Sequence, residues 1–458
     1  MRQGAKRLLP ERQLKVHRLT QTLEAALAVL PAGPLLVAYS GGLDSSALLH
    51  ALAGLDAARL RGLSALHVDH ALQPDSRAWS EHCQRFAQAL GVPIRRITIE
   101  VGSGTGFGPE AAARRARYGA IETVLAPGEI LALAHHRDDQ AETVLLKLMR
   151  GSGPEGLGAM RTLRPLGLGH AWRPLLDLPQ AALRDYATVH GLAWVQDPSN
   201  FDMTIDRNLV RAQILPRLRE RWPEADASIV MASAWARAAA DFIEGAAEQA
   251  LASLQGLDPA TLRCRGWLDL PEALRDPALR RWLRGLGLPE PTHFQTAELL
   301  RQLAEAGDDR QPCVRWPGAE VRRYRDLLYA SAPLRSPPLD WTARLDRGDV
   351  ELPAELGVLR LAVDAGAPGA ETVPPLHVRF RRGGEAIRLP GSEHRRDLAQ
   401  LFQESGLPPW ERGRLPLVFG EDGTLLAVAD LWTSEEGQAV FARLGRRVHW
   451  IGYAGTRG

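Results

Sequence analysis

Short apolar runs alternate with longer, helically patterned segments between residues 35 and 150. Each apolar run is too short for a globular helix and is bounded by glycine or proline on at least one side. We therefore predict strands at residues 35–39, 63–68, 94–99 and 130–134, and helices at residues 44–55, 76–90 and 110–125. Strands that alternate with helices form right-handed crossovers and hence a parallel, doubly wound α/β sheet. Ligands bind such sheets at the carboxyl ends of the strands, so we expect the chemistry there.

A short glycine-containing turn follows the first predicted strand and opens a helix. Its residues are Ser40, Gly41, Gly42, Leu43, Asp44 and Ser45. Glycines adopt the backbone angles that bring N–H groups close to an anion, and the helix N-terminus adds unpaired donors, so we predict a phosphate site. Asp44, an anion beside that site, is then explained if it holds Mg²⁺. The alternative is that Asp44 or Ser45 only caps the helix.

The rest of the chain suggests further domains. We predict a catalytic domain over residues 1–220, a helical middle domain over 221–335 and a C-terminal domain over 345–458. The middle region begins with one long alanine-rich stretch, residues 226–254, and we expect it to be all-helical. Strand-like runs return after residue 350 around one predicted helix at 397–405, which indicates a small α+β domain.

Composition excludes several classes of protein. Hydrophobic residues make up 45% of the 458 residues, enough for a sizeable core, but no stretch approaches 18 consecutive apolar residues, so we expect no membrane span. The three cysteines, Cys83, Cys264 and Cys313, are too few and too scattered for a disulfide scaffold, a zinc ribbon or an iron–sulfur cluster. A reducing cytoplasm is the expected compartment. The net charge of +2 is too small to argue for nucleic acid.

A series of motifs in fixed order indicates a family. The glycine turn resembles the pyrophosphate loop (PP-loop) of the ATP-pyrophosphatase superfamily, which transfers AMP to a carbonyl or amide oxygen. Further motifs follow the turn at residues 67–72, 110–118, 134–143, 150–157, 173–176, 197–200 and 207–211, and in the C-terminal region at 379–385 and 407–412. Together with the turn, these motifs resemble the tRNA(Ile)-lysidine synthetase family.

The resemblance implies a Rossmann-like PP-loop domain and a C-terminal tRNA-binding domain. It also implies a reaction: ATP adenylates the wobble cytidine of the isoleucine tRNA with a CAU anticodon, L-lysine then attacks C2, and lysidine, AMP and pyrophosphate result. ATP and Mg²⁺ are the implied cofactors. The sequence leaves open whether the chain forms a homodimer and which group deprotonates lysine.

An acidic helix start at residues 138–142 has two interpretations. Asp139 and Glu142, three residues apart, fit a capping box. They also share a helix face beside the expected ligand crevice, where two carboxylates suit a lysine ammonium, and the resemblance implicates this stretch in binding the amino acid. His135 either closes the strand as a polar residue or contacts phosphate and relays a proton, and we take it with Asp44 and Asp139 as a candidate catalytic residue.

Arginines at helical spacing are candidates for contacting tRNA. Arg114 and Arg117 share one predicted face, and so do Arg207 and Arg211 beside Asn208; each set either solubilises the surface or clamps phosphates. The C-terminal candidates are Arg379, Arg381, Arg395 and Arg396, near Phe380 and Trp410, which offer rings for stacking.

Three other functions compete with this prediction. A tRNA thiolase shares the loop, but cluster-dependent thiolases need closely spaced cysteines, which the chain lacks. An amide-forming synthetase is disfavoured because no glutaminase-like half is visible. A non-catalytic RNA-binding protein is disfavoured by the intact loop and the acidic helix.

Overall fold

The computed structural model describes residues 11–69, 76–99, 109–256, 258–307, 310–345, 349–363 and 373–452. The chain divides into two compact units, residues 1–242 and 243–458. The first unit holds the largest sheet, and the second holds smaller antiparallel sheets. None of the described helices combines the length and the apolar composition that a membrane crossing requires.

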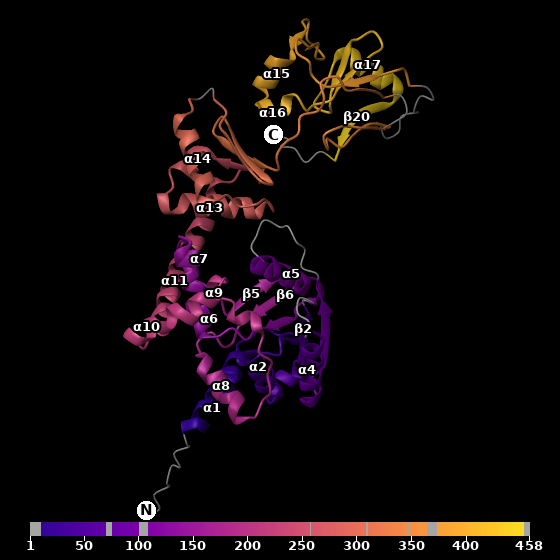
Figure 1. Cartoon of the computed structure of the whole chain (residues 1–458). Coiled ribbons are helices and arrows are strands. Elements are labelled where there is room, and N and C mark those ends of the chain that lie inside the picture. The colour runs from indigo at the N-terminus through magenta and orange to yellow at the C-terminus, as the bar shows by residue number, and fades with distance from the viewer. Residues whose placement is uncertain are drawn as a thin grey trace, which may run out of the picture. The chain divides into compact units, whose positions relative to one another are not determined.

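A six-stranded sheet forms the centre of the first unit (Figure 1). Its order is β3-β2-β1-β4-β6-β5, and neighbouring strands are parallel except β5 and β6, which are antiparallel. The strands are β1 (Leu35–Ala38), β2 (Ser64–Asp69), β3 (Ile94–Thr98), β4 (Ile130–Ala132), β5 (Leu163–Leu166) and β6 (Gly169–Trp172). The four predicted strands and the α/β fold class are confirmed. β5 was missed because it contains Pro165, which a sheet tolerates only at an edge.

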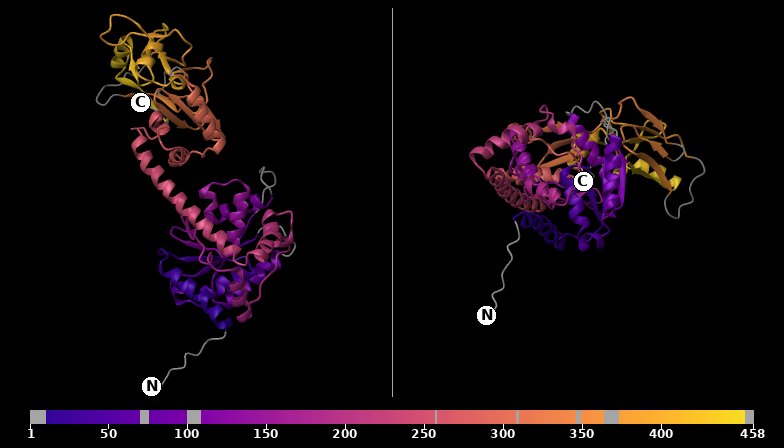
Figure 2. Two further views of the ribbon diagram at one scale, coloured as in Figure 1. Left: turned by 90° about the vertical axis from the view of Figure 1, so that its left-hand side faces the viewer. Right: turned by 60° about the horizontal axis from the view of Figure 1, so that its bottom comes forward.

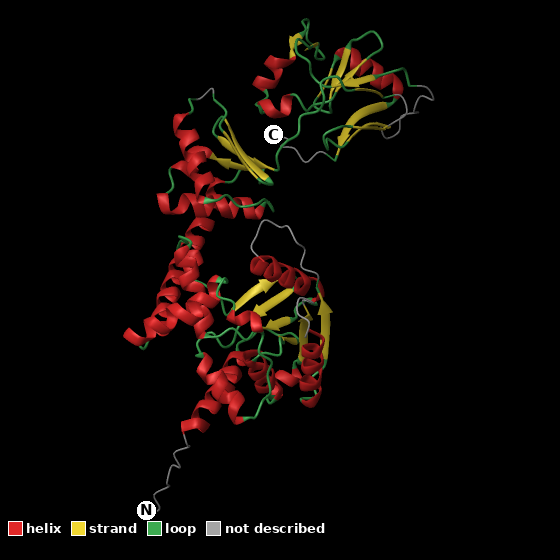
Figure 3. Cartoon of the chain, viewed as in Figure 1, coloured by secondary structure: helices red, strands yellow, loops and turns green. Residues whose placement is uncertain are grey.

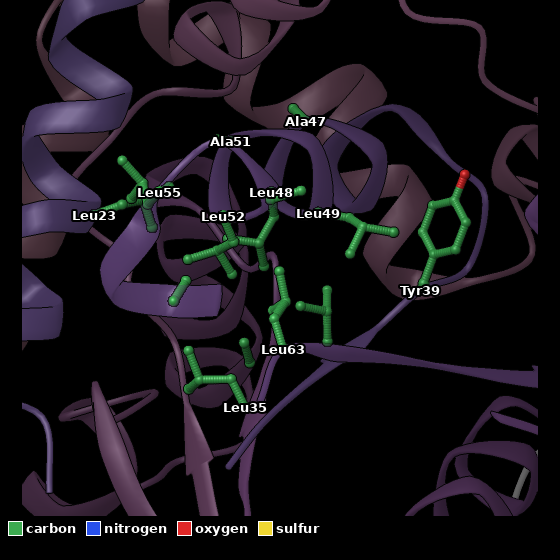
Figure 4. Packing of buried hydrophobic residues seen from close by; sticks show 14 of the residues in the cluster. Leu23, Leu35, Tyr39, Ala47, Leu48, Leu49, Ala51, Leu52, Leu55 and Leu63 are labelled. Atoms are coloured by element: carbon green, nitrogen blue, oxygen red, sulfur yellow. The ribbon is translucent and has the colours of Figure 1, made fainter. Parts of the chain in front are cut away.

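Helices cover both faces of this sheet because alternate strand residues point to opposite sides. Leu35 and Val37 pack into one core with α1, α2, α4 and α8, and Figure 4 shows the α2 leucines beside Leu35. Leu36 packs on the opposite side with Ile121 of α5 and with Leu125, which directly follows that helix. Burying each leucine contributes about 1.5–3 kcal/mol, which fixes β1 and the turn after it. The helices are α1 (Glu11–Ala28), α2 (Leu43–Ala53), α3 (Asp56–Leu60), α4 (Ser76–Ala89), α5 (Pro109–Val124) and α8 (Gln180–Val189).

The remaining helices of the first unit follow the carboxyl ends of β4 and β6. They are α6 (Arg137–Met149), α7 (Pro154–Leu157), α9 (Asp206–Leu209), a π-helical turn (Val210–Ile214) and α10 (Leu215–Arg221), with a 3₁₀ turn at Pro198–Phe201. The next helix, α11 (Ala225–Leu254), is a single long helix, as Figure 2 shows. It matches the alanine-rich stretch that the sequence predicted as helical.

The second unit begins with helices and a four-stranded antiparallel sheet, β7-β10-β9-β8 (Figure 3). The elements are β7 (Thr261–Arg263), α12 (Cys264–Leu268), α13 (Glu272–Gly285), α14 (His293–Glu305), β8 (Cys313–Trp316), β9 (Ala319–Tyr324) and β10 (Leu327–Ser331). Three of these elements are helices, but the middle region is not all-helical, as it was expected to be. The sheet was missed because its strands are short and place arginines such as Arg315 and Arg322 next to the buried Val314 and Val321.

The C-terminal region is α+β, as predicted, with sheets β11-β14-β17-β18-β19, β12-β13-β20 and β15-β16. One core, which includes Phe380 and Phe402, joins these sheets and their helices. The strands are β11 (Thr342–Arg344), β12 (Asp349–Glu351), β13 (Val358–Val363), β14 (His377–Arg379), β15 (Ala386–Ile387), β16 (Arg396–Asp397), β17 (Leu417–Phe419), β18 (Leu425–Val428), β19 (Trp432–Thr433) and β20 (Arg446–Ile451). The helices are α15 (Leu398–Glu404), α16 (Pro409–Arg412) and α17 (Glu435–Leu444).

Candidate active site

The glycine turn lies between β1 and α2, at the carboxyl edge of the sheet. Gly41 has φ +82°, and a Cβ there would lie 2.8 Å from Cys83 Sγ, so this position requires glycine for both conformation and space. The carbonyl of Gly41 accepts a hydrogen bond from Val195 N at 2.9 Å. The turn is therefore held by α4 on one side and by the segment after α8 on the other.

Gly42 is the N-cap of α2, and no described side chain caps this helix. Ser45 Oγ donates to the carbonyl of Gly42 at 3.1 Å and lies 3.0 Å from Ser40 Oγ. Because no described side chain makes a capping hydrogen bond at this helix start, the alternative that Asp44 or Ser45 only caps the helix is wrong. Ser40 is exposed, and Gly42 to Asp44 are half-buried, which leaves this helix end accessible. The helix N-terminus and its hydroxyls fit an anion, as predicted for a phosphate.

Gly42 gives a direct test of ligand approach. Its φ of −75° suits any residue, and the nearest described atom to an added Cβ is Ser40 Oγ at 3.5 Å. We expect Gly42→Ala to keep the melting temperature within a few degrees while raising KM for ATP about tenfold, because the methyl group would stand where the phosphate approaches. An unchanged KM together with an unchanged melting temperature would contradict this placement of the phosphate.

Asp44 faces both the turn and the neighbouring helices. Its Oδ2 accepts from Gln180 Nε2 at 3.4 Å and lies 3.6 Å from His136 Nε2. Its Oδ1 is buried and accepts no hydrogen bond from any described residue. A buried carboxylate oxygen without a donor fits a cation ligand, so Asp44 suits Mg²⁺. The described residues contain no group of three or more His, Cys, Asp or Glu side chains placed to hold a metal, and a Mg²⁺ here would draw its other ligands from phosphate and water.

His136, and not Asp139, is the N-cap of α6. Asp139 Oδ2 accepts from the backbone N–H of His136 at 3.1 Å, so Asp139 is the acidic member of a capping box. The capping box that we predicted between Asp139 and Glu142 is therefore displaced by three residues, because the helix begins at Arg137. Glu142 lies in the helix interior and has another role.

Three carboxylates surround the buried His136 ring. Its Nδ1 lies 3.4 Å from Asp138 Oδ2, and its Nε2 lies 3.3 Å from Asp139 Oδ2 and 3.6 Å from Asp44 Oδ2. Burial alone would lower the pKa of His136, but hydrogen bonds to Asp138 and Asp44 and the charge of Asp139 raise that pKa to about 10. The three carboxylates therefore favour the protonated, imidazolium form of His136.

This imidazolium predicts a pH-dependent stability. Because its folded pKa lies above the unfolded value of ~6.5, its stabilisation is complete below that pH and is lost as pH rises towards 10, at up to ~1.4 kcal/mol per unit. We expect the free energy of unfolding to fall between pH 7 and 9 more steeply in the wild type than in His136→Gln. Urea titrations at several pH values measure this, with the exposed His394→Gln as control. Parallel curves for all three proteins would rule out the charged ring.

Asp139 and Glu142 are ion-paired with Arg207 and Arg211. Glu142 accepts from Arg207 Nε at 2.7 Å and from Arg211 Nε at 2.6 Å, and Asp139 Oδ1 accepts from both guanidiniums at 3.0 and 3.1 Å. Burial raises the pKa of Asp139, but His136, Arg207 and the other nearby cations outweigh it and hold that pKa below its usual value. Glu142 has no exposed surface, whereas Asp139 is 8% exposed.

The structure thus joins two sets of residues that the sequence analysis treated separately. The predicted lysine-binding acids and two predicted tRNA-binding arginines neutralise one another, and neither role is tested by this arrangement. Asn208, which was predicted to contact tRNA together with these two arginines, is buried and donates to the carbonyl of Asp202 at 2.9 Å. Asp138 lies in the predicted acidic helix start but was not selected as a site residue; it pairs with Arg219 at 2.6 Å and accepts from Gln180 N at 2.7 Å.

The remaining candidates of the first unit differ in their exposure to solvent. We call Asp138, Asp139 and Glu142 of α6 the acidic cluster. His135 is half-buried next to this cluster, and Arg117 is exposed on α5. The side chain of Arg114 lies outside the described residues, as do residues 70–72 of the second motif.

The C-terminal arginines are mostly engaged within their own domain. Arg379 pairs with Glu385 at 2.7 Å, Arg381 lies 3.8 Å from the same carboxylate, and Arg396 pairs with Glu404. Arg395 is exposed. The tRNA-binding roles of these arginines remain predictions.

The two aromatic residues expected to stack on bases lie in different surroundings. Phe380 is fully buried in the C-terminal core, so it offers no surface for a base, and that part of the expectation is wrong. Trp410 is half-buried between the edges of Tyr324 and Tyr329, with the Arg322 guanidinium 5.3 Å from its ring centroid.

Comparisons with known proteins decide the family. A family described as a PP-loop domain matches residues 13–218, and families described as the TilS substrate binding domain and the TilS substrate C-terminal domain match residues 262–329 and 376–450. A curated tRNA(Ile)-lysidine synthase from Xanthomonas axonopodis pv. citri is 44% identical over 414 residues, which is 88% of this chain and 91% of that protein. The chain belongs to the tRNA(Ile)-lysidine synthase family.

Other members of the family give the same result. The tRNA(Ile)-lysidine synthase of Alkalilimnicola ehrlichii is 44% identical over 428 residues, covering 91% of this chain and 94% of its own length. That of Pseudomonas aeruginosa is 41% identical over 430 residues, covering 90% and 93%. Among solved structures, a tRNA thiolase from Methanococcus maripaludis aligns with a TM-score of 0.41 and 16% identity over 48% of this chain and 78% of its own. The resemblance found in the motifs is confirmed, and the chain is an ATP-using enzyme.

Proposed function

We propose that this chain joins L-lysine to C2 of the wobble cytidine of the isoleucine tRNA with a CAU anticodon, with ATP as the activating substrate and lysidine, AMP and pyrophosphate as products. The observation that carries the proposal is the accessible glycine turn at a helix N-terminus, placed beside a buried acidic cluster in a chain of this family. We also propose a cytoplasmic location, which the free thiols of Cys83, Cys264 and Cys313 support.

In the first step, the turn from Ser40 to Ser45 holds the phosphates of ATP, and O2 of the splayed cytidine attacks the α-phosphate. The N–H groups at the start of α2 stabilise the charge that develops as pyrophosphate leaves. We assign Mg²⁺ to Asp44; when bound, the ion supplies Lewis-acid stabilisation of phosphate oxygens. Adenylation converts a poor leaving oxygen into a good one.

In the second step, lysine attacks C2 through its ε-amine, and AMP departs. That amine must first lose a proton from its reference pKa of ~10.4, and nearby carboxylates would raise its pKa. Asp139 and Glu142 would therefore keep a bound amino group protonated and unreactive. We propose that they hold the α-ammonium of lysine and leave the ε-amine free to react. Because Arg207 and Arg211 occupy these carboxylates, this binding requires the two side chains to move from them.

The proton acceptor follows from the same electrostatics. The carboxylates around His136 favour its protonated form, which cannot accept a further proton. Its neighbour His135 is half-buried at the end of β4, and we propose that it accepts the proton of the ε-amine.

The proposal is tested by incubating the protein with ATP, labelled lysine and a CAU-anticodon isoleucine tRNA transcript, followed by digestion to nucleosides. We expect labelled lysidine and one pyrophosphate per lysine incorporated, and no label in methionine tRNA, which carries the same anticodon. Pyrophosphate release without a labelled nucleoside would instead indicate another adenylating reaction.

A further inference from the structure

A separate cavity of about 410 Å³ lies in the first unit, outside the acidic cluster. Its polar and aromatic lining comprises Tyr118, Glu155, Arg161, Arg164, Arg173 and Arg237. The lining therefore holds four guanidiniums and one carboxylate, and Asp241, which is not part of the lining, accepts a hydrogen bond from Arg161. The excess positive charge indicates an anionic ligand.

Part of the cavity lining lies at the same sheet edge as the phosphate turn. Arg173 directly follows β6, which is parallel to β4, and the backbones after these strands meet in a bridge between His136 and Leu175. The side chain of Gln140 on α6 bonds both the N–H and the carbonyl of Met160, at 2.9 and 2.8 Å, and so fixes the cavity wall to the helix that carries the acidic cluster.

Arg237 in the cavity lining is incompletely satisfied. Arg237 donates through Nη2 to the carbonyls of Met160, at 2.8 Å, and of Gly158, but its buried Nε reaches no described acceptor. Burial and the nearby Arg161 lower the pKa of Arg237, which indicates a guanidinium short of negative charge. An anion in the cavity would accept a hydrogen bond from Arg237 Nε and would supply negative charge beside its guanidinium.

An aromatic ring completes the lining. Tyr118 is half-buried, and the Arg164 guanidinium lies 5.5 Å from its ring centroid. Proteins that read single-stranded RNA place splayed bases on such rings or guanidinium planes while arginines hold the phosphates. The volume suits one nucleotide.

We propose that this cavity binds a splayed-out nucleotide of the RNA substrate next to the modified cytidine, with its phosphate on the arginines and its base against Tyr118. The inference rests on the proposed function for the identity of the RNA. The chemistry of the lining by itself specifies a phosphate with an attached planar group, which ATP also offers, and the experiment separates the two.

The test uses Arg164→Ala in the full chain, because Arg164 contacts the Tyr118 ring and donates to the adjacent Pro165 carbonyl. We expect the isoleucine tRNA transcript to bind about tenfold more weakly, with the slope of log K against log salt reduced by ~0.7–0.9, and ATP affinity to stay the same. Arg164→Lys should restore the salt slope. The matched control is Arg96→Ala, exposed on edge strand β3 at the other end of the sheet.

Two other outcomes would contradict the proposal. Weaker ATP binding with unchanged tRNA binding would assign the cavity to ATP, and tRNA binding equal to that of Arg96→Ala would remove the nucleotide from it; either result overturns the proposal. Lysine incorporation by the wild type, measured in parallel, shows separately whether the proposed function holds.

Discussion

Replacing Asp44 with asparagine is expected to abolish lysine incorporation into tRNA, with kcat/KM for ATP reduced about 10³-fold or more. The amide keeps the size of the side chain and its hydrogen bond from Gln180, but it removes the charge that we assign to Mg²⁺. Loss of metal-assisted charge stabilisation amounts to several kcal/mol, and ~1.4 kcal/mol corresponds to a factor of ten in rate. Pyrophosphate release at saturating lysine and tRNA measures the effect.

A matched control separates this loss from a general effect on the helix start. Asp56 is also an acid in the first turn of a helix, α3, but it is exposed. Asp56→Asn should therefore keep full activity. If Asp44→Asn retained wild-type activity while remaining folded, the assignment of Asp44 to the metal would be wrong.

Much of the catalytic unit was predictable because its signals are local. An apolar strand, a glycine turn and a helix are adjacent in the chain, so the residues that build the phosphate site are also adjacent. Gly41 illustrates the point: its left-handed φ is what a sharp turn of this kind requires.

The acidic site was less predictable because its partners are distant in the chain. Glu142 and Arg207 are 65 residues apart, and nothing in local spacing joins them. The sequence nevertheless contained a signal for this pairing. Two acids three residues apart form one negatively charged helix face, two arginines four residues apart form a positively charged one, and the two faces are complementary in charge. The role of His136 was missed because the sequence shows two adjacent histidines and does not reveal which one is buried.

Replacing Glu142 with glutamine is expected to destabilise the protein by about 3 kcal/mol. Glu142 is fully buried and accepts hydrogen bonds from two guanidiniums, and removing one partner of a buried ion pair leaves uncompensated charge. Arg211 is 38% exposed, so water offsets part of the loss. Urea unfolding at pH 7 measures the change, and the exposed Glu220→Gln should show almost none.

A second substitution distinguishes a structural carboxylate from one that also binds lysine. The double variant Glu142→Gln/Arg211→Gln loses one cation together with the anion. Its loss of free energy of unfolding should therefore be smaller than the sum of the losses in the two single variants. If Glu142 also holds the α-ammonium of lysine, KM for lysine rises at least tenfold in Glu142→Gln and stays high in the double variant. If Glu142 only anchors the arginines, KM returns towards the wild-type value as stability returns. The two roles therefore separate in one set of four proteins, because charge balance restores the fold but cannot replace a ligand of the substrate.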